Sequence, residues 1–263
     1  MQSIGQDLLD EYQALAALCD TLSPDEWQQP TAFYGWSAWD EIAHLCYFDE
    51  TGLQSATDED SFNQAALPLA KRLYAGEQIS GIARERYAHL DGPALLAHWR
   101  DLHQALVNAL LAHDPKDRLP WYGPPMSARS FASARLMETW AHGQDIWDVV
   151  KRQRPASHRL KHIAHLGVTT FKWTFVNRQL PVPEVLPHVV LTAPDGDTWT
   201  WNESSSSHCV HGSAEDFCLL VTQRRHLNDT ALHYVGEDVQ RWLLMAQCFA
   251  GPPADGPMAG VRV

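Results

Sequence analysis

A carboxylate and an imidazole four residues apart, Glu138 and His142, are the residues of this chain whose spacing most directly suggests chemistry. Side chains at positions i and i+4 of a helix lie on one face, with their Cβ atoms about 5–6 Å apart. That separation suits two ligands of one metal ion, which would also compensate the cost of removing both groups from water. The pair predicts part of a metal site, although taken alone it also fits a helix that binds no metal.

A catalytic zinc site needs a third protein ligand and one open position. His44 is the best candidate, because it lies about two turns into a second predicted helix that begins near Ser37. It flanks the apolar face of that helix, from which it can face Glu138 and His142. Two imidazoles and a carboxylate favour Zn²⁺, with another divalent metal as the alternative.

Two charged residues lie one helical turn outside the pair. Asp145 follows His142 and is a candidate to accept a hydrogen bond from a ligand histidine. Arg135 precedes Glu138, so it can steer that carboxylate or bind substrate, and a surface salt bridge is the simpler alternative. These two residues complete the predicted catalytic group on this helix.

Three large side chains, Trp121, Tyr122 and Met126, precede the same helix. They are candidates to line the mouth of a pocket and to bind a cofactor there. Ordinary packing explains them equally well, since aromatic residues and methionine are common core residues.

Four long helices are predicted to position these residues. Apolar residues recur at three- and four-residue steps, and proline or capping residues mark the ends. The expected helices are about 4–19, from about 37, from about 93 to 114, and 127–147, with the acidic segment 57–67 predicted as a loop. A further helix is expected at 158–177. The first part of the chain is therefore predicted to be a four-helix bundle.

The pattern changes after Pro181-Val182-Pro183. Two alternating β-type runs flank an Asp195-Gly196 turn, which predicts a hairpin. A third strand near 207–210, a helix at 214–223, a strand near 232–235 and a helix at 238–249 complete a small α+β domain. We therefore predict two domains, 1–180 and 181–263.

The composition excludes several classes of protein. The chain has 263 residues and a formal net charge of −12, which argues against nucleic acid as a partner. Its five cysteines are scattered without a Cys-x-x-Cys pair, as expected for a reduced protein. The N-terminus lacks the pattern of a signal peptide, and no apolar run reaches the roughly 18 residues of a membrane span. We expect a cytoplasmic protein that binds a small-molecule substrate and no membrane, as either a monomer or a homodimer.

One combination of segments resembles a known family. The segment Gly35–Leu45, together with Arg135–Glu138 and His142–Asp145, resembles the mycothiol-dependent maleylpyruvate isomerase family. The resemblance covers nearly the whole chain. It implies an α+β fold, with an N-terminal DinB-like metal-binding four-helix bundle followed by a small sterol-carrier-like α/β domain. Within the family, the segment Trp121–Ser127 is closer to an uncharacterised metal-binding branch than to the isomerase itself.

The resemblance also implies roles for particular residues. Carried over by position, His44, Glu138 and His142 are the zinc ligands. The family has an arginine after the apolar helix of the C-terminal domain that reaches the active site, and here Arg224 or Arg225 takes that position. The usual glycine before this arginine is replaced by Gln223, which leaves the choice between the two arginines open.

Three functions are compatible with these residues. The first is a metal-dependent isomerase or transferase that acts on a small organic acid by way of a low-molecular-weight thiol or an activated water. In the isomerase reaction that the resemblance implies, a thiol adds to a cis double bond, the resulting single bond rotates, and elimination gives the trans isomer. The second is a zinc-dependent hydrolase or lyase without a thiol cofactor. The third is a non-catalytic module that binds metal or an apolar ligand.

Overall fold

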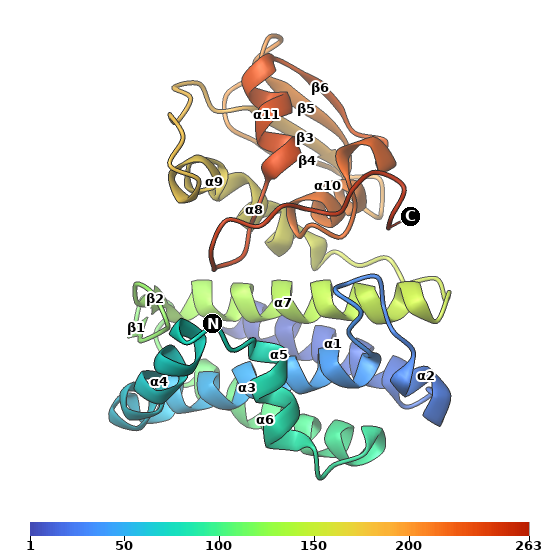
Figure 1. Cartoon of the computed structure of the whole chain (residues 1–263). Coiled ribbons are helices and arrows are strands. Elements are labelled where there is room, and N and C mark those ends of the chain that lie inside the picture. The colour runs from blue at the N-terminus through green and yellow to red at the C-terminus, as the bar shows by residue number, and fades with distance from the viewer. Residues whose placement is uncertain (263) are drawn as a thin grey trace. The chain divides into compact units, whose positions relative to one another are not determined.

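The computed structural model of the protein describes residues 1–262 (Figure 1). The chain forms two compact units, Met1–Gln153 and the part that begins at Arg154. The sequence placed the boundary later, at 180/181, because helical periodicity ends there. The earlier division arises because α8 (Leu160–Thr169) packs on a helix of the second unit: a Cβ atom added to Gly167 would lie 2.8 Å from Val221. Periodicity marks where a helix ends, but it does not show which unit the helix packs on.

The first unit is built on a four-helix bundle, as predicted. Helices α1 and α3 each pack on both α6 and α7, so the four helices enclose one core. Its fully buried residues include Leu8, Ile42, Leu95, Trp99 and Leu136. The bundle helices are α1 (Gln2–Cys19), α3 (Ala38–Thr57), α6 (Gly92–Leu111) and α7 (Ala128–Val149).

Side chains cap the helices that carry the candidate metal ligands. The Ser37 hydroxyl accepts the N–H of Asp40, and the Asp40 carboxylate accepts the N–H of Ser37, which forms a capping box at the start of α3. The Ser127 hydroxyl accepts the N–H of Ser130 at 3.1 Å and starts α7. Both helices begin where the sequence predicts, near Ser37 and at 127. The caps fix where each helix begins and hence which side chains face the bundle interior.

The prediction of a loop at 57–67 is wrong, because α4 (Glu59–Tyr74) begins there. The Asp58 side chain caps this helix by accepting the N–H of Ser61 at 3.0 Å. Acidic residues in the first turn interact favourably with the positive end of the helix dipole, so the acidic composition belongs to a helix start. The remaining elements of the unit are α2 (Pro24–Gln28), α5 (Ile79–Tyr87), β1 (Arg118–Leu119) and β2 (Met126–Ser127).

The second unit contains a four-stranded sheet in the order β4-β3-β5-β6. The predicted hairpin is present, since β3 and β4 pair antiparallel across a turn in which Gly196 has φ +92°. Strand β5 pairs parallel to β3 with His188 opposite Cys209, and β6 pairs antiparallel to β5. The strands are β3 (His188–Thr192), β4 (Thr198–Trp201), β5 (Cys209–Ser213) and β6 (His233–Val235).

Helices α8 and α10 of this unit pack on each other, and α10 also packs on β3 and β5. The single helix predicted at 158–177 is two helices, because the chain departs from helical geometry at Thr170, whose hydroxyl donates to the carbonyl of Leu166 at 2.7 Å. The other helices are α9 (Phe171–Asn177), α10 (Ala214–Val221), the 3₁₀ turn η1 (Leu227–Asp229) and α11 (Glu237–Met245). The α+β fold class is thus confirmed. No helix within residues 1–262 combines the length and apolar character needed to span a membrane.

Candidate metal site

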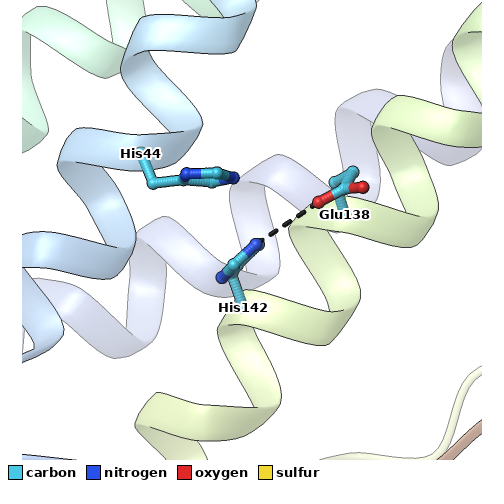
Figure 2. Close-up of side chains that lie close together, drawn as sticks. All are labelled: His44, Glu138 and His142. Atoms are coloured by element: carbon cyan, nitrogen blue, oxygen red, sulfur yellow. Dashed lines mark ion pairs between the residues drawn. The ribbon is translucent and has the colours of Figure 1, made fainter. Parts of the chain in front are cut away.

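The three residues predicted to bind metal come together inside the first unit. His44 projects from α3, and Glu138 and His142 project from α7 toward the same point (Figure 2). One potential ligand atom from each of the three side chains lies within 4.8 Å of the other two. Residues separated by almost a hundred positions in the sequence therefore present two imidazoles and a carboxylate to one small volume.

The two histidines are shielded from solvent, while the carboxylate is more accessible. His44 is 9% exposed and His142 is 4% exposed, whereas the Glu138 side chain is 24% exposed. Glu138 is therefore the most accessible of the three side chains. Two histidines and one glutamate are a ligand set found in catalytic zinc sites.

The two ring nitrogens of His142 have different partners. Nε2 lies 3.3 Å from the Glu138 carboxylate, on the side of the candidate metal position. Nδ1 lies 2.7 Å from Oε2 of Glu41, a side chain of α3 with no exposed surface. With Nδ1 protonated and hydrogen-bonded to a carboxylate, the lone pair of a neutral imidazole is on Nε2, the nitrogen that faces Glu138 and His44. The residues present thus fit a divalent cation, which His44, Glu138 and His142 would hold.

Aromatic rings surround the two histidines. The Trp36 ring stacks on His142 at a centroid distance of 5.9 Å with an interplanar angle of 9°, and it lies 5.2 Å from the ring of His44. Phe33 contacts His142 edge-on at 5.4 Å, and Phe48 contacts His44 at 4.8 Å. These rings exclude water from the histidines, which strengthens electrostatic interactions at the site.

Arg135 forms a buried ion pair and not the surface salt bridge that was its simpler alternative. It is 3% exposed, and its Nε donates to Oδ1 of Asp49 at 2.8 Å. Burial disfavours the charge of Arg135, but the carboxylate of Asp49 outweighs this effect and raises the pKa of the guanidinium. Arg135 pairs with a buried carboxylate because it lies on the inner face of α7, where a guanidinium is stable only with a buried counterion. A charge of Glu138 also raises that pKa, so Arg135 remains electrostatically linked to the candidate ligand.

Glu41 lies at hydrogen-bond distance from Nδ1 of His142, and the role of Asp145 as a hydrogen-bond acceptor for a ligand histidine stays a prediction. Asp145 is 3% exposed, and one of its oxygens lies within 4.8 Å of atoms of both Glu41 and His142. Glu41 was missed because it lies on a different helix from His142. The available signal was its spacing three residues before His44, which places both side chains on one face of α3.

Two of the three residues predicted to bind a cofactor, Trp121 and Tyr122, are connected to His44 through ring contacts of Phe48. Phe48, which contacts His44, is 6.0 Å from Tyr122 and 6.1 Å from Trp121. Tyr122 lines a pocket of about 160 Å³ between α3, α4 and α5. Met126 lies in β2 opposite Leu119. Trp121 also packs on Phe62, Tyr122 and Phe131, so packing accounts for part of its surface.

Arg224 and Arg225 belong to the second unit, directly after α10. The N–H of Arg224 donates to the carbonyl of Leu219 at 2.7 Å, and the N–H of Gln223 donates to the carbonyl of Leu220 at 2.9 Å, which is a Schellman ending of the helix. Gln223 has φ +58°, a left-handed conformation that favours glycine. Gln223 therefore adopts the backbone conformation expected of the glycine that the family has at this position. Because Arg224 follows Gln223 directly, it is favoured over Arg225 as the counterpart of the family's arginine.

The fold and the site together define a class of protein, a four-helix bundle that carries a His-Glu-His group able to hold a metal ion, followed by an α+β unit. A family model agrees: that of the mycothiol maleylpyruvate isomerase N-terminal domain matches residues 8–147. The chain belongs to this family.

Relatives and solved structures extend the match beyond the first unit. Two uncharacterized proteins of Mycobacterium tuberculosis, from strains H37Rv and CDC 1551, are 45% identical to this chain over 250 residues, covering 95% of it and 96% of each relative. The crystal structure of a mycothiol-dependent maleylpyruvate isomerase has a TM-score of 0.52 at 13% identity and covers 83% of this chain and 87% of its own. A histidine-to-alanine variant of that enzyme has a TM-score of 0.53 at 12% identity, with the same coverage. At this identity the likeness to the solved structures shows the fold.

Proposed function

We propose that the protein is a metal-dependent enzyme that acts on a small organic acid, as an isomerase or transferase that uses a low-molecular-weight thiol or water. The observation that supports this most is the convergence of His44, Glu138 and His142, whose ligand atoms lie within 4.8 Å of one another. If these residues hold Zn²⁺ or another divalent cation, the pKa of a thiol or water bound to it would be lowered, and a nucleophile would then be available at neutral pH.

The residues around the candidate ligands have separate proposed roles. Trp36 and Phe48 exclude water from the histidines, and the accessible side of Glu138 leaves room for substrate. Trp121, Tyr122 and Met126 are proposed to bind the cofactor, and the contacts of Phe48 with His44, Trp121 and Tyr122 support this for the two aromatic residues.

Arg224 is proposed to bind the carboxylate of the substrate, with Arg225 as the alternative. An organic acid carries a carboxylate, which the planar guanidinium of arginine can bind with two parallel hydrogen bonds. Arg224 is 3% exposed, and its Nη1 donates to the carbonyl of Thr222 at 2.8 Å. Arg135 is less suited to this role, because its charge is paired with the carboxylate of Asp49 in the core of the first unit. The Schellman ending of α10 supports the choice of Arg224.

The enzymes of known structure with this fold suggest the first compounds to test. Metal-loaded protein is incubated with maleylpyruvate and mycothiol, and then with other small cis-unsaturated acids and thiols, with products separated by liquid chromatography. We expect conversion that requires both metal and thiol and that is lost in His44→Ala. Thiol-independent hydrolysis would instead support the second candidate, a zinc-dependent hydrolase or lyase. If metal-loaded protein converts none of these acids with any thiol, the isomerase assignment is wrong.

A further inference from the structure

We propose that Glu41 is a positioning residue that orients His142 and sets the affinity of the site for its metal ion. The proposal rests on the metal site of the proposed function, and it adds a residue that is not among the predicted ligands or catalytic residues. It is based on the contacts of one carboxylate, both of whose oxygens have a defined neighbour.

The first contact is the hydrogen bond between Oε2 of Glu41 and Nδ1 of His142, at 2.7 Å. Glu41 has no exposed surface and His142 is 4% exposed, so water does not compete for this bond. A histidine that binds metal through Nε2 must carry its proton on Nδ1. The carboxylate of Glu41 accepts that proton in a hydrogen bond, and this arrangement makes Nε2 a better donor to a metal.

The second contact holds Glu41 itself. The hydroxyl of Thr31 donates to Oε1 of Glu41 at 3.3 Å. Thr31 is 5% exposed, and its N–H donates to the carbonyl of Trp36 at 2.7 Å, which closes the loop before α3. The carboxylate is therefore fixed from two sides, by this loop and by His142.

The location of Glu41 on α3 explains why its position matters for the metal. His44 and His142 come from different helices, α3 and α7, so the distance between their nitrogens depends on how these helices pack. Glu41 lies three residues before His44 on the same face of α3, and its hydrogen bond crosses to α7. One interaction thus fixes both the ring orientation of His142 and the spacing of the two helices that supply the ligands.

The experiment measures the affinity of the full-length protein for Zn²⁺ by competition with a chromophoric chelator, and the visible spectrum of the Co²⁺-substituted protein. Hydrogen-bond partners of metal-binding histidines typically contribute 10- to 100-fold to metal affinity. Glu41→Ala is expected to lower the affinity by about 10- to 100-fold. Glu41→Gln retains an acceptor oxygen without the charge, so its affinity should lie between those of Glu41→Ala and the wild type. Both variants should shift the Co²⁺ absorption bands.

Glu50→Gln is the matched control, because Glu50 lies on the same helix but pairs with Arg86. It should leave the affinity and the Co²⁺ spectrum unchanged. If Glu41→Ala does not fold, the Zn²⁺ affinity and the Co²⁺ spectrum of Glu41→Gln test whether Glu41 orients His142. Wild-type affinity in the folded Glu41 variants, or an equal loss in Glu50→Gln, would overturn the proposal. A wild-type protein that binds no divalent metal would instead contradict the proposed function.

Discussion

Arg135 and Asp49 form an ion pair of 2.8 Å inside the four-helix bundle, with side chains that are 4% and 0% exposed. Asp49 also accepts hydrogen bonds from the hydroxyl of Tyr12 at 2.7 Å and from Nε1 of Trp99 at 2.8 Å. These contacts come from α1, α6 and α7, while Asp49 itself lies on α3. The carboxylate of Asp49 therefore joins all four helices of the bundle, and its partner Arg135 lies one turn before the candidate ligand Glu138 on α7.

Removing the cation of this pair should destabilise the bundle strongly. Breaking a buried ion pair by removing one partner costs about 3–5 kcal/mol, because the other charge stays buried. We expect Arg135→Ala to lower the free energy of unfolding by about this amount, toward the lower end since Tyr12 and Trp99 still bond to Asp49. The measurement is denaturant unfolding in the presence of a chelator, so that metal binding does not contribute.

Arg72→Ala is the control for that variant. Arg72 pairs with Glu77 and Glu85 on the surface, where its side chain is 37% exposed. An exposed pair of this kind contributes up to about 1 kcal/mol. If Arg135→Ala loses no more stability than Arg72→Ala, the pair with Asp49 does not stabilise the bundle as argued.

Removal of any one candidate ligand should abolish metal binding. We expect wild-type protein to retain about one divalent metal ion per chain after dialysis, as a three-ligand zinc site does. His44→Ala, Glu138→Ala and His142→Ala should each lose it. Metal content measured by mass spectrometry tests this, with the exposed His98→Ala as the control. Full metal occupancy in all three ligand variants would show that the site lies elsewhere.

A buried histidine should make the stability of the bundle depend on pH. His103 is 4% exposed and stacks on Tyr12 at 4.6 Å, and burial lowers its pKa from 6.5 to about 4. Between these two values the unfolded chain binds a proton that the folded chain does not, so stability falls as the pH is lowered from 6.5 toward 4. A shift of this size corresponds to roughly 3 kcal/mol.

The variant His103→Phe isolates this contribution. It keeps an aromatic ring against Tyr12 and removes the titrating group. We expect the wild type to lose more unfolding free energy than His103→Phe between pH 7 and pH 4.5, measured by denaturant unfolding in chelator. Identical pH profiles for the two proteins would refute the assignment of the low pKa to His103.

Arg224 should affect turnover without affecting metal binding. Loss of a charged group that holds the substrate commonly lowers the rate by about 10²- to 10³-fold. We therefore expect Arg224→Ala to reduce turnover by about a hundredfold while the metal content remains that of the wild type. Arg225→Ala is the matched neighbour and should be close to wild type. The hypothesis fails if both variants retain wild-type turnover on the true substrate.

Local patterns in the sequence predicted much of the fold. Capping residues such as Ser37 and Ser127 act on backbone groups a few positions away, so their effect can be predicted from adjacent residues. The Asp195-Gly196 turn is equally local. The acidic segment 57–67 was misread because the same residues occur in loops and at helix starts, and only the cap by Asp58 distinguishes the two. The division between the two units depends on the packing of α8 on α10, which has no local signature.

For the candidate site, the sequence by itself determined that Glu138 and His142 share one face of α7, because a spacing of four residues fixes this in any helix. Only the tertiary structure decided that Glu41 meets His142 and that Arg135 meets Asp49. Both contacts join α3 to α7, and their geometry depends on how two helices distant in the sequence pack against each other. A buried carboxylate has a low free energy only beside a partner, and which partner it finds is settled by that packing.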